Sequence, residues 1–413
     1  MLEEFFDLLR NPSFYLKILD VLYVSAPVWI PIVLITIAFD IWMNLKRREW
    51  IASQGSVLLE VKLPREQMKS PLAMELFLNH LHQTSAGTLI DVYMKGRVRP
   101  WFSLELVSIG GAVKFFIWMH KGFRARVEAQ LYAQFPNIEI HEAEDYSMSV
   151  KRNPEKLSIG YFGQFTLTKP DAYPIKTYVD YGLDKDPKEE FKIDPMVSVI
   201  EYLGSLKKGE QAWIQILIRG HAKEGLKLGR IVVKPDWKKD VEKEIAKILK
   251  EGRFKSAEEK NVSGQHMSEG QKDLVKAIER TTGKLAFDTA IRAAYIAEKD
   301  AFNPANIGGV IGSITQFGSN ALNGFRPSFG AGYDYPWQDP FGKKKANNER
   351  ELLEAYKRRS YFELPFKHIG GKPFILTTEE IATVFHFPGE VAGTPTLTRI
   401  PSKKAEAPAN LPI

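Results

Sequence analysis

Residues Trp101–Met119 read WFSLELVSIGGAVKFFIWM, and this stretch decides the fold class of the chain. Apolar and polar side chains alternate over Trp101–Ile109, as they do in strands that bury one face, and Val113–Met119 follows Gly110 and Gly111 as a second apolar run. Two glycines between two such runs are typical of a tight turn. We therefore predict a β-hairpin within an antiparallel sheet.

The flanking segments extend this hairpin to a βαββαβ series. The sequence alternates like a strand over Val57–Pro64 and has apolar residues at helical spacing over Leu72–Leu81. After the hairpin, Phe123–Phe135 is predicted to be an amphipathic helix and Asn137–Glu142 a strand. This order is that of the ferredoxin-like fold, an antiparallel sheet with two helices on one face. We assign it to residues 50–150, although the fold alone names no function.

A second α+β domain is predicted for residues 157–318. Its elements alternate between strand and helix, so it resembles a repeat of the first domain with insertions. The segment 251–269 is rich in Gly, Ser, Lys and Glu and is predicted to be an exposed loop. The predicted elements are a strand from Tyr161, a helix at Pro195–Leu206, a strand at Trp213–Ile218, a helix at Asp236–Leu249, a strand at Lys284–Ile296 and a helix at Pro304–Phe317.

The last hundred residues are predicted to be less regular. Residues 319–348 are dense in Gly, Asn, Pro and aromatic side chains, which favours an extended loop. This loop is either a contact segment or a passive linker lying on its own domain. Residues 349–390 form a predicted helical segment whose last helix, TTEEIATVFHF, starts at a threonine cap with glutamates in its first turn. The Pro-rich tail, 391–413, is expected to be mobile.

An uncharged run from Val21 to Phe39, VLYVSAPVWIPIVLITIAF, predicts a membrane anchor. At about 1.5 Å per residue its 19 residues span about 28 Å, close to the hydrocarbon thickness of about 30 Å. We predict one transmembrane helix over residues 21–44. The alternatives are a buried helix of a soluble protein and a cleaved signal peptide, and the acidic amino terminus argues against the second.

The charges that flank the run predict its orientation. Ile41, Trp42 and Met43 extend the apolar run past Asp40. Lys46, Arg47 and Arg48 come after this extension, and Trp29 and Trp42 suit the two membrane interfaces. The positive-inside rule then puts residues 1–20 outside and the bulk of the chain in the cytoplasm. We therefore expect a single-pass protein of the bacterial inner membrane, with these five residues as its anchor and the lipid bilayer as one partner.

Composition limits the chemistry that this chain can perform. The 57 basic and 50 acidic residues give a net charge of +7 spread over 413 residues, which permits nucleic-acid binding without indicating it. The chain has no cysteine. Disulfides, thiolate catalysis and cysteine metal sites are therefore excluded.

The remaining motifs predict no catalytic, cofactor or metal site. His80 and His82 lie two apart on a predicted helix and point to different faces, which favours structural or solvated roles over a metal site. The HEAED motif at His141 begins like a zinc-protease motif, but Asp145 stands where that motif has its second histidine. The Gly-Lys pair within Thr281–Leu285 lacks the first glycine and the following Ser or Thr of a phosphate loop.

Several segments in order resemble the membrane-anchored region that precedes the motor domain of conjugative DNA-transfer ATPases of the type IV secretion class, especially in small-genome bacteria. They are FSLELVSIGG, VEAQLYAQFPNIEIHEAEDY, LTKPDAYPIKTYVDYGLD, DPMVSVIEYLGSLKKGEQAWIQILIR, NPANIGGVIGSI and FILTTEEIATVFHFPG, with ANLPI at the close. They cover most of residues 50–413. In that family the ATPase domain follows, whereas this chain ends at Ile413. The resemblance implies association with a DNA-pumping motor, either as a separate subunit or as the amino-terminal part of a longer ATPase.

Three functions are compatible with these features. The first is a non-catalytic docking component of a conjugation or secretion apparatus, whose partner is the motor ATPase. The second is a free-standing membrane scaffold that self-associates as a homo-oligomer, and the third is a membrane-bound hydrolase. For the first we expect the motor to attach at residues 377–413. The candidate docking residues are the apolar face Ile381, Val384, Phe385 and Phe387, which could instead pack on the second domain.

Overall fold

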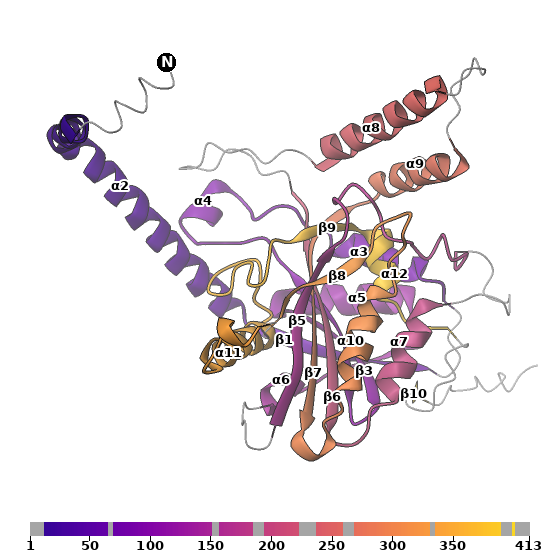
Figure 1. Cartoon of the computed structure of the whole chain (residues 1–413). Coiled ribbons are helices and arrows are strands. Elements are labelled where there is room, and N and C mark those ends of the chain that lie inside the picture. Colours follow the sequence, from indigo (N-terminus) through magenta and orange to yellow (C-terminus); the bar gives the residue numbers. More distant parts are fainter. Residues whose placement is uncertain are drawn as a thin grey trace, which may run out of the picture. The chain divides into compact units, whose positions relative to one another are not determined.

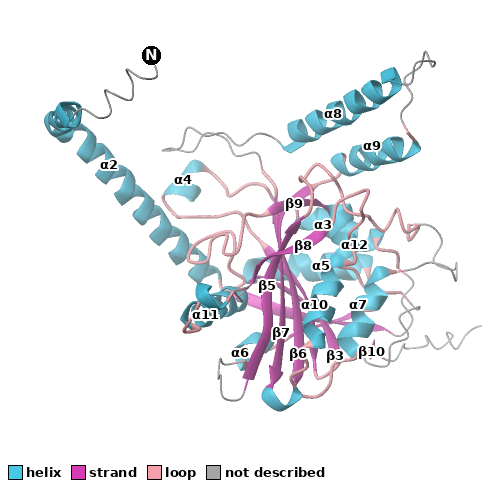
Figure 2. Cartoon of the chain, in the orientation of Figure 1, coloured by secondary structure: helices cyan, strands magenta, loops and turns pink. Residues whose placement is uncertain are grey.

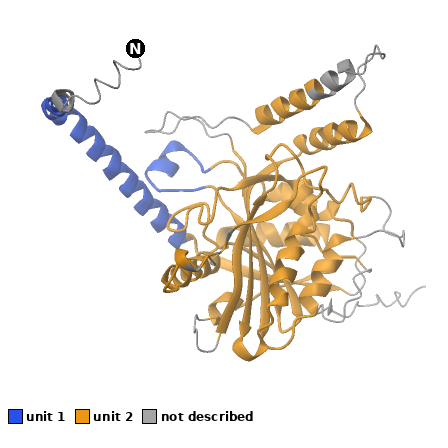
Figure 3. Ribbon diagram, in the orientation of Figure 1, with its two compact units in different colours: residues 1–53, 86–98, 226–232 blue, residues 54–85, 99–225, 233–413 orange. Residues whose placement is uncertain are grey.

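The computed structural model describes most of the chain as helices, strands and short connections (Figure 1). The described residues are 12–64, 69–150, 157–184, 194–222, 237–258, 268–330, 335–389 and 399–400. They fall into two compact units, which Figure 3 colours separately. The first comprises residues 1–53, 86–98 and 226–232, and the second comprises the rest of the chain.

The first unit is built on one long helix, α2, which runs from Pro12 to Gln54 without interruption. Both Pro27 and Pro31 lie inside it. Its apolar part is long enough to cross a membrane and none of it is buried, so the chain has one candidate membrane helix among the described residues. The predicted span, residues 21–44, lies within α2. The short helix α4, Leu89–Tyr93, belongs to the same unit.

The second unit contains one sheet of ten strands, drawn in magenta in Figure 2, in which every pairing is antiparallel except that of β10 with β1. In its first half the strands lie in the order β4-β1-β3-β2. The predicted hairpin is confirmed, because β2 and β3 pair from Ser103 opposite Trp118 to Ile109 opposite Ala112. The bounds are Ser56–Pro64 for β1, Phe102–Ile109 for β2, Ala112–His120 for β3 and Glu139–Glu142 for β4.

The second half of the sheet has the order β6-β7-β5-β8. It joins the first half through β2 and β6, which pair over eight residues from Phe102 opposite Ile218 to Ile109 opposite Gln211. The strands of the predicted domains 50–150 and 157–318 therefore belong to one sheet in the second unit, whereas residues 50–53, 86–98 and 226–232 belong to the first unit. The bounds are Leu157–Leu167 for β5, Glu210–Gly220 for β6, Ala286–Glu298 for β7 and Phe325–Gly330 for β8.

Two short strands complete the sheet. The strand β9, Phe374–Thr377, pairs antiparallel with β7, and β10, Arg399–Ile400, pairs parallel with Leu63 and Pro64 of β1. Both come from the carboxyl-terminal part of the chain. That part therefore belongs to the sheet at two places, one in each half.

Helices cover both faces of the sheet (Figure 1). One face carries the main apolar core and the helices α3, α5, α7, α10 and α12. The other carries α6 and α11. The helix bounds are Leu72–Leu81 for α3, Arg124–Gln134 for α5, Tyr146–Ser149 for α6, Pro195–Gly204 for α7, Ala305–Thr315 for α10, Lys343–Lys357 for α11 and Thr378–Val384 for α12.

Between β6 and β7 the chain forms two further helices, α8 and α9, where the first half of the sheet has only the Gly110-Gly111 turn. The bounds are Trp237–Glu258 for α8 and Glu269–Thr282 for α9. A small apolar cluster joins them, with Val241 and Ile248 from α8 and Ile278 from α9. The predicted loop 251–269 is wrong at both ends, because α8 extends to Glu258 and Ser268 caps α9 with its side chain.

The predicted loop 319–348 is also partly wrong. It contains β8, and α11 begins inside it at Lys343. The strand forms in spite of its glycines and proline because β5 supplies hydrogen-bonding partners, with Leu167 opposite Phe325. Residues 1–11 and almost all of the predicted tail lie outside the described residues.

Candidate functional site

The five predicted anchor residues lie along α2. Trp29 is exposed, and the half-buried ring of Trp42 lies 6.0 Å from that of Phe39. Lys46 Nζ donates to Glu49 Oε2 over 2.8 Å, while Arg47 is half-buried and Arg48 exposed. One helix thus contains both the uncharged run and, after six further residues, the basic cluster.

The face of the sheet beneath α11 contains a row of buried polar side chains. Glu105 of β2 lies opposite Gln215 of β6, which lies opposite Arg292 of β7, which in turn lies opposite Gln164 of β5. All four are at most 1% exposed. We call these four residues the polar row. It crosses the junction between the two halves of the sheet.

The carboxylate of Glu105 is fully satisfied. Arg359 Nε donates to its Oε1 over 2.9 Å and Nη2 donates to Oε2 over 3.0 Å, a two-point contact typical of guanidinium and carboxylate. Ser103 and Tyr146 donate their hydroxyls over 2.6 and 2.9 Å. Arg359 also bonds Asp145, so one buried cation connects the sheet to the start of α6.

Arg292 has a different environment, although it is equally buried. Its Nη2 donates to the carbonyl of Ser360 over 2.9 Å, and its Nε and Nη1 have no hydrogen-bond partner among the described residues. No carboxylate of the described residues pairs with it. The guanidinium carbon lies 5.1 Å from the centre of the Tyr361 ring, and burial lowers the pKa of Arg292 to about 10. This residue is held by packing and by one backbone carbonyl.

A second charged cluster lies where β6 ends and β7 begins. Asp288 accepts from His221 Nδ1 over 2.7 Å and from Arg219 Nη2 over 3.0 Å, and Arg99 approaches it to 3.5 Å. Burial opposes ionisation of Asp288, but the histidine hydrogen bond and the two arginine charges outweigh it and hold the pKa at about 2. The cluster neutralises a carboxylate that links the ends of two strands.

Lys284, the lysine of the sequence's Gly-Lys pair, is also engaged within the fold. Its Nζ lies 2.7 Å from Oε1 of Glu75, a carboxylate that is 3% exposed. Glu75 in turn accepts from the Tyr178 hydroxyl over 2.6 Å. The lysine therefore compensates a buried carboxylate, in a setting unlike that of a phosphate loop.

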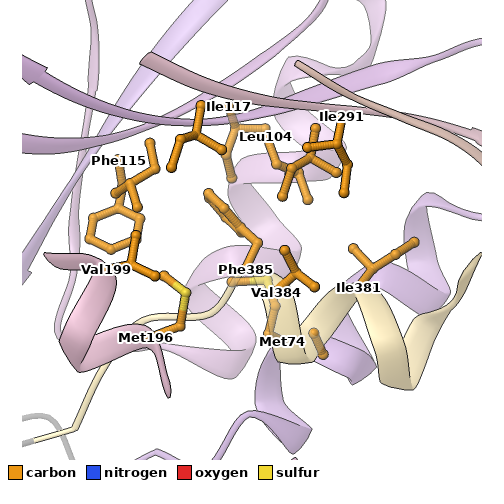
Figure 4. Packing of buried hydrophobic residues seen from close by; sticks show 14 of the residues in the cluster. Met74, Leu104, Phe115, Ile117, Met196, Val199, Ile291, Ile381, Val384 and Phe385 are labelled. Carbon is orange, nitrogen blue, oxygen red and sulfur yellow. The ribbon is translucent and has the colours of Figure 1, made fainter. Parts of the chain in front are cut away.

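The candidate docking residues Ile381, Val384, Phe385 and Phe387 do not form an exposed face. Each is at most 4% exposed and belongs to the main apolar core. Figure 4 shows three of them among Met74 of α3, Phe115 of β3 and Val199 of α7. The alternative raised from the sequence, packing within the protein, is therefore the one observed. A β-strand before α12 and helices around it bury all sides of this segment.

An exposed aromatic cluster lies instead in the segment that precedes α11. Tyr335, Trp337 and Phe341 are 52%, 73% and 83% exposed, and the first two rings stack at 4.7 Å. Exposed lysines follow at positions 343–345. We call residues 335–345 the aromatic segment. Large rings are enriched in protein interfaces, so this part of the predicted loop is the stronger candidate for a contact surface.

The sequence reasoning missed the polar row. Its signal was a single polar residue inside an apolar strand: Glu in FSLELVSI, Gln in AWIQILI, Arg in TAIRAAY and Gln in YFGQFTL. Such residues in buried strands need partners. The sequence does not give the strand register that brings the four together.

An apolar amino-terminal helix and an α+β fold built on one ten-stranded sheet define the class of this protein. It belongs to the family described as "Domain of unknown function (DUF8128)", whose model matches residues 41–399. The match extends from the middle of α2 to β10 and so includes both halves of the sheet. No curated protein matches the chain.

Proposed function

We propose that this chain is a membrane-anchored, non-catalytic docking component, and that its partner is the motor ATPase of a conjugative or type IV secretion DNA-transfer system. The main support for a docking role is the aromatic segment, which exposes three large rings next to three lysines. A tryptophan and a tyrosine at such exposure lose much apolar hydration on binding, which is why these residues dominate interface energies. The resemblance to motor-associated regions supports the identity of the partner.

The anchor in this proposal is α2, in a bacterial inner membrane. Its exposed apolar run would face lipid, and the basic cluster after the run favours a cytoplasmic position for the second unit. The non-catalytic role is supported by how the charged clusters are used. Arg359, Asp288 and Lys284 each engage a buried or strand-terminal partner, so their charges hold the fold together.

We further interpret each half of the sheet as a ferredoxin-like unit. The strand orders support this, because β4-β1-β3-β2 and β8-β5-β7-β6 both follow the pattern fourth, first, third, second. Each half also places helices between its first and second and between its third and fourth strands. In this interpretation α8 and α9 are an insertion in the hairpin β6–β7 of the second half of the sheet. The second half would then be the repeat with insertions that the sequence analysis predicts.

The test is co-purification from detergent-solubilised membranes with identification of the bound proteins. Trp337→Ser combined with Phe341→Ser removes two exposed rings without opening the core. The matched control is Met148→Ser, which removes an exposed apolar side chain from α6. We expect the wild type and the control to recover a DNA-transfer ATPase, and the double variant to recover less of it. Recovery of other copies of this chain alone would favour the self-associating scaffold and overturn the proposal.

A further inference from the structure

The short helix α4 exposes an apolar surface within the first unit. Leu89, Ile90 and Met94 are 76%, 65% and 61% exposed. The helix is well formed in spite of its length, since Thr88 and Asp91 make a reciprocal capping box and Lys95 Nζ lies 2.8 Å from Asp91 Oδ1. The three apolar side chains are therefore presented by an ordered turn. A cluster of this kind at a protein surface marks an interaction site.

The position of α4 along α2 indicates what covers this surface. The Tyr93 ring lies 6.2 Å from that of Phe39, the last residue of the uncharged run. Gly96 lies against the backbone of Lys46, where an added Cβ would meet the carbonyl carbon at 2.4 Å. The segment 86–98 thus runs beside α2 from the end of the apolar run to the start of the basic cluster. Seven residues of helix cover about 10 Å, the depth of a membrane interface.

The burial of side chains along one face of α2 agrees with a contact between α2 and the segment 86–98. Phe39, Met43 and Lys46 are spaced by four and three residues, so they share one face of α2. Phe39 and Lys46 are half-buried and Met43 is 4% exposed, whereas residues 27–38 are all exposed. Between residues 27 and 46 this face is covered only where the uncharged run gives way to charge.

We propose that α4 lies in the interfacial layer of the bilayer and inserts Leu89, Ile90 and Met94 between the lipid headgroups, beside the transmembrane part of α2. This inference rests on the proposed membrane anchor. Lys95 and Arg97 are exposed in the same segment and suit the phosphate groups at that depth. A helix and a basic cluster would then fix both the depth and the rotation of the anchor, which a single span alone leaves free.

The absence of cysteine allows a direct test on the full chain. Single variants Leu89→Cys and Ile90→Cys would carry the environment-sensitive dye NBD in liposomes that contain anionic lipid. Matched positions are Ile32→Cys in the apolar run, 58% exposed, and Met148→Cys on α6, 55% exposed. We expect the dye at 89 and 90 to emit at shorter wavelength than at 148. We also expect lipids with a quencher near the headgroup to quench it, and lipids with a deep quencher to quench the dye at 32.

The outcomes separate this inference from the anchor on which it rests. Lipid quenching at 32 combined with water-like emission at 89 and 90 would overturn the interfacial position of α4 and leave the anchor intact. Water-like emission at 32 would overturn the anchor, and the inference with it. Because the labelled positions are exposed in the structure, none of the substitutions removes a core contact.

Discussion

Two equally buried arginines are expected to respond in opposite ways to the same substitution. Arg359 and Arg292 are both 0% exposed, but Arg359 pairs with Glu105 and Asp145 whereas Arg292 has no carboxylate among the described residues. Arg359→Met leaves the buried Glu105 without its cation, which costs about 3–5 kcal/mol of unfolding free energy. Arg292→Met removes a buried charge that has a single hydrogen bond, so we expect no loss or a gain of about 1 kcal/mol.

The assay is urea unfolding of the full chain in detergent, followed by fluorescence of its eight tryptophans. Midpoints are compared at equal slope, since a changed slope means a changed unfolding reaction. Arg358→Met is the control for the loss of one positive charge, because this side chain is 61% exposed and makes one ion pair of 3.7 Å. Its expected effect is below about 0.5 kcal/mol. Equal destabilisation by Arg359→Met and Arg292→Met would refute the reasoning.

Three further predictions follow from individual contacts. The carboxyl of Asp288 has a pKa lowered to about 2, so its contribution of about 2 kcal/mol is complete above pH about 4 and is lost as the pH falls from about 4 to 2. Asp288→Asn should reduce the fall of the urea midpoint between about pH 4 and 2. An unchanged fall in the variant would exclude Asp288 as its origin. Gly96 has a φ of +71° and no room for a Cβ, so Gly96→Ala should speed hydrogen exchange of the backbone amides in residues 86–98. Gly342 has a similar φ of +65° but open space around it, so Gly342→Ala should change amide exchange only in its own turn. The purified chain with magnesium and ATP should give background turnover, and robust turnover abolished by Lys284→Ala would contradict this.

The strands in the first half of the sheet could be predicted from local patterns in the sequence. The hairpin at Gly110 and Gly111 was predictable because adjacent strands and their turn lie in one short stretch. The strand β8 and the helix α9 were missed, since their sequences are rich in loop-forming or charged residues and their stability comes from β5 and from the α8 contact. Tertiary packing overrides composition in such segments.

The site residues show the same limit. The predicted anchor residues rest on charge and hydropathy, which can be read from consecutive residues, and they stay a prediction. The burial of Ile381 and Phe385 did not follow from the sequence, because an apolar helix face has the same pattern whether its partner is this chain or another protein. The polar row depends on the pairing of β2 with β6, which are separated by more than a hundred residues, so only the structure shows it.

The membrane anchor and its orientation can be tested most directly by labelling two single-cysteine variants of this cysteine-free chain. Leu16→Cys lies before the uncharged run of α2, and Lys276→Cys lies on the exposed side of α9. A maleimide that does not cross membranes would be added to intact spheroplasts and, separately, after lysis. We predict labelling at position 16 in both samples and at position 276 only after lysis. Labelling at 276 in intact spheroplasts would contradict a cytoplasmic second unit and the docking function built on it.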